Sequence, residues 1–506
     1  MTMKRFSPRM FERAALRRSV AFVALFAALA AVVFCLAACV RKPESAPFGE
    51  VPVYDIELSY DGGNALSLAQ EIVYLNDTGD HLDDVRLHLY ANAFSEDATT
   101  PPYLPDEKDN FFIDGESFGS IDISSAEING KTVDFELSEN RQVLILPTDA
   151  DDGDVLEISV SAELTLPRCR SRFGVSERTV NLAGFYPSLC VYENGAWREE
   201  GYTAVGDPFY SEISSFYVTL SVPEGYLAAS SGTVLENHTS DGTTTSVISA
   251  ENVRDFAMCL SRDFELLSAS FLIDGRNVTV DYYTLGDSDA KGALASVVSA
   301  LETFSSVFGA YPYSRLAVAE SHIHAGGMEY GSFVVLDASV TDPDALSDVA
   351  VHETAHQWWF GVVGSDQLNN AWLDEGLTEF CTAYYHLLRG DEDAYRSFVS
   401  AAKQNYLVYR RLPAAVGFDG AMSRPLSSFL TDGEYVAVTY AKGVLLFDTL
   451  LQLAGKDKLN AALSDYFSSN AYSIATPADL SESFVRAGFD ASGIISSFAA
   501  GTEIIN

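Results

Sequence analysis

Basic residues are scarce in this sequence of 506 residues, which has 32 Lys and Arg against 71 Asp and Glu and a net charge of −39. A chain this acidic repels phosphate groups, which argues against nucleic-acid binding and against attraction of the main body to an anionic membrane surface. Apolar residues at 47% and aromatic residues at 12% suffice for a large packed core, which excludes an intrinsically disordered chain. At the usual domain size, the length predicts about two to four domains.

Cysteine is also scarce, with six residues in the whole chain. A chain of this length builds a core without covalent cross-links, so a disulfide scaffold is excluded. Cys169 and Cys190 could pair across a loop, but buried free thiols explain them equally well, and the sequence leaves the choice open. The sequence also has no internal repeat and no low-complexity block, which argues against a repeat architecture.

Only one long uncharged apolar run is present, the 21 residues from Val20 to Val40, and it follows six basic residues between positions 4 and 18. Basic residues ahead of an apolar run are typical of an export signal. The run contains Leu36-Ala37-Ala38-Cys39, the pattern of a bacterial lipobox, so we predict a lipoprotein anchored to the membrane at Cys39. An uncleaved transmembrane anchor is the alternative, because 21 apolar residues can span a bilayer. Both predictions place the protein outside the cytoplasm, on the bacterial cell surface.

A polar, proline-containing tether is expected at residues 41–50. The chain after it divides into two parts that differ in their pattern of apolar residues. Between residues 51 and 284, short apolar or alternating runs separated by Gly- and Asp-rich turns predict a large antiparallel β domain. From 285 to 506 helical spacing dominates, with strands expected at 315–319 and 332–336. The predicted class is therefore a multidomain protein with a β-rich N-terminal domain followed by a mainly helical one.

The strongest chemical motif is His352-Glu353-Thr354-Ala355-His356. Two histidines four residues apart lie on one face of a helix, so both imidazoles can reach one metal ion. Glu353 projects beside them, where it can take a proton from a water molecule at the metal. With only eight histidines in the chain, a chance match has a probability of about 1%, which disfavours an ordinary structural helix.

A zinc site needs a third protein ligand, and Glu375 follows His356 after eighteen intervening residues. This length allows the helix to end and a second helix to return past it. Glu379, one turn later, could orient one histidine through its other ring nitrogen. An ordinary acidic helix face is the alternative explanation for Asp374, Glu375 and Glu379.

Four further segments accompany these residues: Ala325–Tyr330, His356–Gly361, Ser423–Leu426 and Tyr440–Gly443, with Tyr435 five residues before Tyr440. Together with the metal-binding motif, they resemble the aminopeptidase N family of zinc metallopeptidases over about residues 51–506. The first segment is similar to the family's exopeptidase motif, Gly-Ala-Met-Glu-Asn. Here Gly327 replaces the alanine and Tyr330 the asparagine, which leaves Glu329 in place and changes the contacts expected around it.

The resemblance implies roles for individual residues. One zinc ion per chain would be held by His352, His356 and Glu375. Glu353 would act as general base, and Tyr440 would donate a hydrogen bond to the oxyanion. The substrate would lie along the exopeptidase segment, with Glu329 on its free amine. The neighbouring members of that binding segment are Gly326, Gly327 and Met328.

The resemblance also implies an activity and an architecture. Residues 285–506 would form a thermolysin-like catalytic domain, with no large helical domain after it. The predicted function is a zinc aminopeptidase that removes N-terminal residues from peptides outside the cytoplasm, with zinc-activated water attacking the peptide carbonyl. A zinc endopeptidase and a non-catalytic surface lipoprotein that keeps the fold as a binding module are the alternatives. The sequence leaves the side-chain preference, the natural substrate and the oligomeric state open.

Overall fold

Strands with alternating burial open the described part of the chain. The computed structural model describes residues 51–323, 325–411, 419–503 and 505, so the predicted export segment, Cys39 and the tether lie outside it. β1 (Val53–Tyr60) and β2 (Ala65–Leu75) bury every second side chain, because one face of their sheet packs on the core while the other faces solvent. The alternation in the sequence predicts this arrangement.

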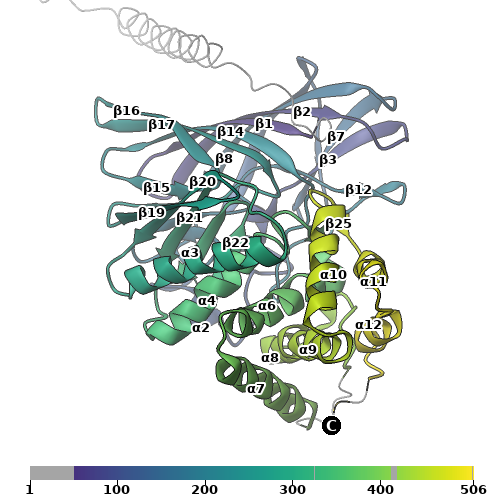
Figure 1. The fold of residues 1–506 in the computed structure, drawn as a ribbon. Helices are drawn as coiled ribbons and strands as arrows, with labels where there is room; N and C mark the ends of the chain where they lie inside the picture. Colours follow the sequence, from purple (N-terminus) through teal and green to yellow (C-terminus); the bar gives the residue numbers. More distant parts are fainter. Residues whose placement is uncertain (1–50, 324, 412–418, 504, 506) are drawn as a thin grey trace, which may run out of the picture. The chain divides into compact units, whose positions relative to one another are not determined.

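Three sheets and one short hairpin make up the β-rich part of the protein (Figure 1). In spatial order, the eight-stranded sheet contains β16 (Thr233–Ser240), β17 (Thr243–Val253), β14 (Ser214–Pro223), β1, β2, β8 (Val155–Thr165), β4 (Ser120–Ile128) and β5 (Lys131–Thr132). One four-stranded sheet contains β15 (Leu227–Ser230), β18 (Met258–Ser261), β10 (Val180–Leu182) and β9 (Phe173–Val175). The other contains β11 (Ser188–Leu189), β3 (Leu82–His88), β7 (Val143–Ala150) and β6 (Glu136–Leu137). The remaining elements of this part are the hairpin β12 (Tyr192–Glu193) and β13 (Ala196–Trp197), η1 (Tyr90–Phe94) and α2 (Lys108–Phe111).

A five-stranded sheet begins the second part of the molecule. Its spatial order is β19 (Glu265–Ile273), β20 (Arg276–Thr284), β21 (Arg315–Ser321), β23 (Phe333–Asp337) and β22 (Gly327–Tyr330). β20 pairs with β21 in parallel, so the β19–β20 hairpin belongs to this sheet and not to the β-rich sheets before it. We therefore propose that the boundary between the two parts lies near residues 262–264 instead of at 284, where the change in sequence pattern had placed it.

Helices form the rest of the second part. The longer ones are α3 (Ala290–Val307), α4 (Pro343–Ala355), α6 (Glu375–Leu388), α7 (Glu392–Arg411), α9 (Lys442–Ala454), α10 (Lys456–Ser469), α11 (Pro477–Arg486) and α12 (Ser492–Ala499). The short elements are α5 (Gln367–Asn370), η2 (Ala371–Leu373), η3 (Leu426–Ser428), α8 (Asp432–Tyr435), η4 (Val436–Ala441) and the strand pair β24 (Gly364–Ser365) with β25 (Ile474–Ala475). α3 packs on β19 and β20, and α4 packs on β22 and β23 (Figure 1). The predicted fold class, a β-rich region followed by a mainly helical domain, is confirmed.

The four cysteines after position 50 are all buried free thiols. Cys169 and Cys190, whose pairing the sequence left open, belong to this group. Burial raises the pKa of each thiol. They therefore act as small apolar residues of the core.

One stretch of the described chain, Asp432–Ala454, is long and apolar enough to cross a membrane. However, 67% of its most apolar window is buried inside the protein. This burial is what the core helix of a folded domain shows.

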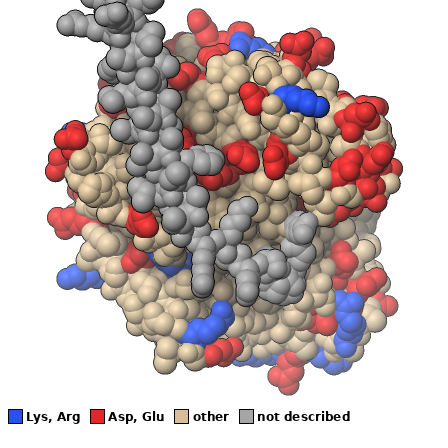
Figure 2. All heavy atoms as spheres, turned by 90° about the horizontal axis from the view of Figure 1, so that it is seen from above, with Lys and Arg blue, Asp and Glu red and all other residues tan. Residues whose placement is uncertain are grey.

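The surface carries the acidity that the composition predicts. On the face shown in Figure 2, acidic side chains are spread widely and basic side chains are few. A high net charge of one sign keeps a protein soluble, and this is the simplest physical consequence of the composition.

Two glycines allow α6 and α9 to cross at very short distance. A Cβ atom built on Gly443 would lie 2.3 Å from the Cα of Gly376, and one built on Gly376 would lie 2.8 Å from the Thr439 carbonyl oxygen. Backbone atoms cannot swing aside as a flexible side chain can. α6 begins at Glu375 and α9 follows Tyr440, so the crossing fixes the distance between these two residues.

We expect Gly443→Ala to lower the free energy of unfolding by about 1–3 kcal/mol, because the added methyl group overpacks the crossing. Gly493→Ala in α12 is the matched control, since a Cβ there meets no atom within 4 Å and should change stability by less than about 1 kcal/mol. Denaturant unfolding of both variants measures the difference. Equal stabilities for the two variants would contradict the close-crossing explanation.

Candidate metal centre and catalytic cavity

α4 carries His352 of the predicted metal motif on its last turn and ends at His356, the second histidine, as its C-cap. The helix begins with Pro343. The residue before it, Asp342, caps the helix, because its side chain accepts a hydrogen bond from the Ala345 backbone amide at 3.0 Å. This cap and the proline at the first position are standard signals for a helix start. Apolar residues of the helix are buried, so its orientation is fixed and His352 and His356 face the same side.

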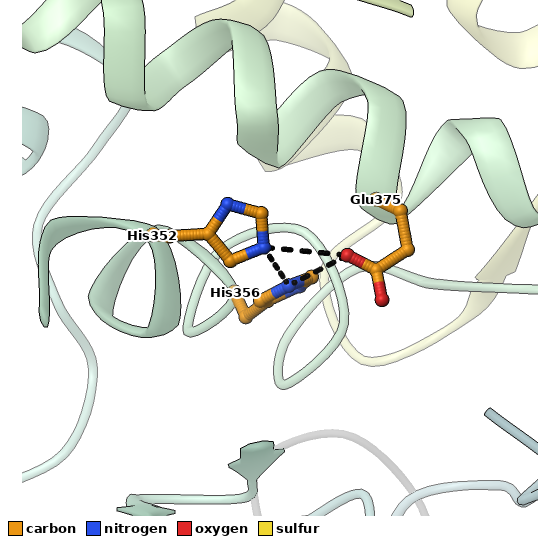
Figure 3. A group of neighbouring side chains, drawn as sticks. All are labelled: His352, His356 and Glu375. Atoms are coloured by element: carbon orange, nitrogen blue, oxygen red, sulfur yellow. Dashed lines mark hydrogen bonds and ion pairs between the residues drawn. The ribbon is translucent and has the colours of Figure 1, made fainter. Parts of the chain in front are cut away.

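Three atoms converge at this point (Figure 3). The Nε2 atoms of His352 and His356 are 3.1 Å apart, and Oε2 of Glu375 lies 3.3 Å from each of them. A tetrahedral zinc ion with bonds of about 2.0–2.2 Å separates its ligand atoms by about 3.3–3.6 Å. The three donor atoms therefore fit one zinc ion, and they are the triad that the sequence predicted.

Two carboxylates hold the other ring nitrogens of the histidines. Glu379 Oε2 lies 2.9 Å from Nδ1 of His352. Asp374 Oδ1 lies 2.7 Å from Nδ1 of His356, and its second oxygen accepts a hydrogen bond from Gln367 at 2.7 Å. A carboxylate on Nδ1 keeps the proton there and leaves Nε2 free to bind a metal.

Sequence reasoning grouped Asp374 only with a possible acidic helix face. Its contact depends on how the chain returns to His356 after α4, which no local pattern shows. The available signal was its position directly before Glu375, at the start of α6.

Burial and mutual charge dominate the electrostatics of the centre. Burial alone would lower the pKa of His352, but hydrogen bonds to Glu375 and Glu379 raise it to about 10. Burial raises the pKa of Glu353 to about 7 and that of Glu329 well above its usual range. A cation that enters the site therefore stabilises the ionised form of these buried carboxyl groups.

The centre opens into a cavity of about 620 Å³. Glu329 on β22 and Glu353 on α4 both line it, and each side chain has at most 5% of its surface exposed. One carboxylate oxygen of each, Oε1 of Glu329 and Oε2 of Glu353, is buried without a hydrogen-bond partner among the described residues. Buried acceptors are normally satisfied, so these two oxygens mark positions where a ligand would supply the missing donors.

Residues 326–328 run at contact distance along α4, the metal helix, which carries His352 and ends at His356. A Cβ atom on Gly327 would lie 2.3 Å from Oε1 of Glu353, so any larger residue there would displace that carboxylate. Gly326 has more room, with Val349 at 3.8 Å from a built Cβ. Met328 is buried and also contributes to the cavity wall.

Tyr440 reaches the centre from η4, which is a π-helical turn. Its ring stacks on His352 with centroids 6.0 Å apart, and burial, together with the nearby charge of Glu375, raises the pKa of its phenol well above the usual range. In a π-helix residues five apart lie near the same face, whereas in an α-helix they diverge. Tyr435 therefore lies beside Tyr440, at 5.6 Å between ring centroids, with a buried hydroxyl that has no hydrogen-bond partner in the described chain.

The β-rich part supplies a wall of the same cavity. Arg172 and Asp207 form an ion pair there, and the carboxylate of Asp207 lies within 4.8 Å of those of Glu329 and Glu375. Neither residue was singled out from the sequence. Both lie in irregular segments outside any motif, so only the folded chain brings them to the metal centre.

Comparison with known proteins shows what the second part of the chain resembles. Residues 293–498 match the Peptidase family M1 domain. Aminopeptidase 2 of Candida albicans is 23% identical over 464 residues, which cover 85% of this chain and 47% of that protein. Aminopeptidase N of Lactobacillus helveticus is 23% identical over 392 residues, which cover 71% of this chain and 43% of that protein. The chain thus spans less than half the length of these two relatives.

Solved structures extend the comparison to the whole fold. The M1 zinc metallopeptidase of Deinococcus radiodurans superimposes with a TM-score of 0.67 at 17% identity, covering 90% of this chain and 95% of that one. The resemblance expected from the sequence motifs is confirmed: residues 293–498 match the M1 peptidase domain, and the chain is similar in sequence to aminopeptidases and in fold to an M1 zinc metallopeptidase.

Proposed function

We propose that this protein is a zinc aminopeptidase that removes N-terminal residues from peptides outside the cytoplasm. One observation carries the proposal: three donor atoms at tetrahedral spacing lie in the same cavity as the buried, unpartnered carboxylate oxygen of Glu329. The first feature suits a hydrolytic metal. The second suits a positively charged group of the substrate.

His352, His356 and Glu375 would hold the zinc ion, with Asp374 and Glu379 orienting the two imidazoles. Zinc in such a site lowers the pKa of water toward about 7 and polarises a carbonyl group. Glu353 would accept the proton of the attacking water on its open oxygen Oε2 and pass it to the leaving amine. Tyr440 would donate its phenolic proton in a hydrogen bond to the oxyanion that develops during attack.

Glu329 would bind the free amine of the peptide. Its carboxylate lies within 4.8 Å of that of Asp207, so an ammonium group between them would relieve the repulsion of two buried acids. Arg172 balances one charge of this pair through Asp207. An amine held at this distance from the metal donors would limit cleavage to the first peptide bond.

The proposed location outside the cytoplasm rests on the sequence of residues 1–40 alone. A membrane anchor there, by lipid at Cys39 or by an uncleaved apolar helix, would present the acidic body to peptides outside the cell.

Cleavage of a free peptide and of its N-acetylated twin by the purified full-length protein in detergent tests the proposal. We expect release of the first residue from the free peptide only. Glu329→Gln should raise KM about 10- to 100-fold, because a charge-assisted hydrogen bond to the amine is lost. Internal cleavage of both peptides would instead mean an endopeptidase. Zinc binding without cleavage of either would mean a binding protein.

We expect Glu353→Gln to lower kcat by about 10²- to 10⁴-fold while the protein still binds one zinc ion, since an amide cannot accept the proton. Steady-state kinetics together with metal analysis of the same sample measure both effects. Glu302→Gln, on an exposed position of α3, is the control and should match the unaltered protein. Retention of most activity by Glu353→Gln would remove this residue from the mechanism.

Asp374→Asn should weaken zinc binding by about 10- to 100-fold, because the hydrogen bond that orients His356 loses its charge. Competition with a chelator below the unfolding temperature measures the affinity. Asp348→Asn is the matched control, since Asp348 accepts from His386 at 3.0 Å, and His386 is not among the metal donors. If both variants bound zinc equally well, Asp374 would have no role at the metal.

A further inference from the structure

The tip of the β22–β23 hairpin is held more tightly than a surface turn. Tyr330 pairs with Phe333, which leaves Gly331 and Ser332 as a two-residue turn, and Ser332 has a φ of 56° in the left-handed region. A Cβ atom on Gly331 would lie 2.7 Å from Cβ of Val253, so the turn is pressed against the end of β17. The turn is therefore an internal contact between the two parts of the protein.

Gln357 holds this turn from the side of the metal helix. The side chain is fully buried, its Nε2 donates to the Tyr330 carbonyl at 3.0 Å, and its Oε1 accepts from the Ser332 amide at 3.0 Å. A carbonyl only accepts and a backbone amide only donates, so the orientation of the side-chain amide is fixed. Sliding of the hairpin along the helix would break both bonds and leave buried polar groups unsatisfied.

The β-rich part holds the turn from the opposite side. Asp255 accepts a hydrogen bond from the Gly331 amide at 2.8 Å. The neighbouring Arg254 donates to the carbonyls of Phe360 at 3.2 Å and Val362 at 3.4 Å, directly after the metal helix. Residues 254–255 thus contact both the hairpin turn and the segment that follows Gln357.

On both the helix and the hairpin, these contacts lie directly beside residues of the proposed active site. Gln357 directly follows the metal donor His356, and Tyr330 directly follows Glu329. The donor atoms of Glu329, Glu353 and His356 all lie within 4.8 Å of one another. A displacement of the hairpin by about 1 Å would alter the distance between the amine-binding carboxylate and the metal donors, and errors of this size strongly affect reactivity.

We propose that Gln357 is a positioning residue for the substrate amine: its two hydrogen bonds set the register between the strand that carries Glu329 and the helix that carries the metal donors. The inference rests on the proposed aminopeptidase function. Gln357 contacts neither substrate nor metal in this scheme. It acts through the backbone of residues 330 and 332.

The test is a double-mutant cycle on the full-length protein, with a free peptide as substrate. Gln357→Met keeps the length of the side chain and removes both hydrogen bonds. We expect KM to rise about tenfold, with kcat changed less than about threefold and one zinc ion still bound. Combined with Glu329→Gln, the substitution should raise KM no further than Glu329→Gln alone, because both changes remove one interaction.

Controls separate positioning from general stability. Gln70→Met removes another buried amide, which donates to the Pro187 carbonyl at 2.8 Å within the β-rich part, and should lower Tm without changing KM. If Gln357→Met does not fold, Gln357→Asn provides the same comparison, because its shorter amide reaches only one of the two partners. Asp255→Asn keeps an oxygen for the Gly331 amide and should leave KM unchanged.

The outcomes are distinct. An active enzyme whose KM changes less than twofold in the Gln357 variant, or whose KM effects multiply in the double variant, overturns the inference and leaves the proposed function intact. An unaltered protein that treats free and N-acetylated peptides alike overturns the proposed function, and the inference with it.

Discussion

The structure depends on a cluster of carboxylate side chains that is buried away from water. Carboxylates of Asp207, Glu329, Glu353, Asp374 and Glu375 are all buried around two histidines. Burying these carboxylates together costs free energy, because they lose hydration and repel one another. A bound cation and a positively charged substrate offset this cost. The surrounding fold supplies what keeps the acids in place: a capped helix, a strand at contact distance, a close helix crossing and a wall from the β-rich part.

Much of the centre could be predicted because its residues obey helical periodicity. His352 and His356 are one turn apart on one helix, and Glu379 is one turn after Glu375 on the next, so spacing alone places each pair on a common face. The division into a β-rich and a helical part also followed from local patterns, because strand alternation and helical spacing are properties of short windows.

What could not be predicted depends on contacts between distant segments. Asp374 meets His356 only because the chain turns back through α5 and η2. Asp207 and Arg172 reach the cavity from irregular segments, where no periodicity exists to read. The β19–β20 hairpin looks like any other hairpin in the sequence, and only its pairing with β21 assigns it to the second sheet. The buried amide of Gln357 satisfies two backbone groups that lie 25 or more residues earlier in the chain.

The π-helical turn η4 has a consequence for how this protein tolerates changes in length. It holds one more residue per turn than the helices on either side, α8 and α9. A single-residue deletion within Val436–Thr439 would let the turn relax to an α-helix and leave the two tyrosines four residues apart, about 40° from each other around the helix axis, so Tyr435 and Tyr440 would still share a face. A single-residue insertion there would instead separate them by more than about 100° around the axis, although no side chain of the centre had been changed. The direction of a length change therefore matters in this segment, and deletions should be tolerated better than insertions.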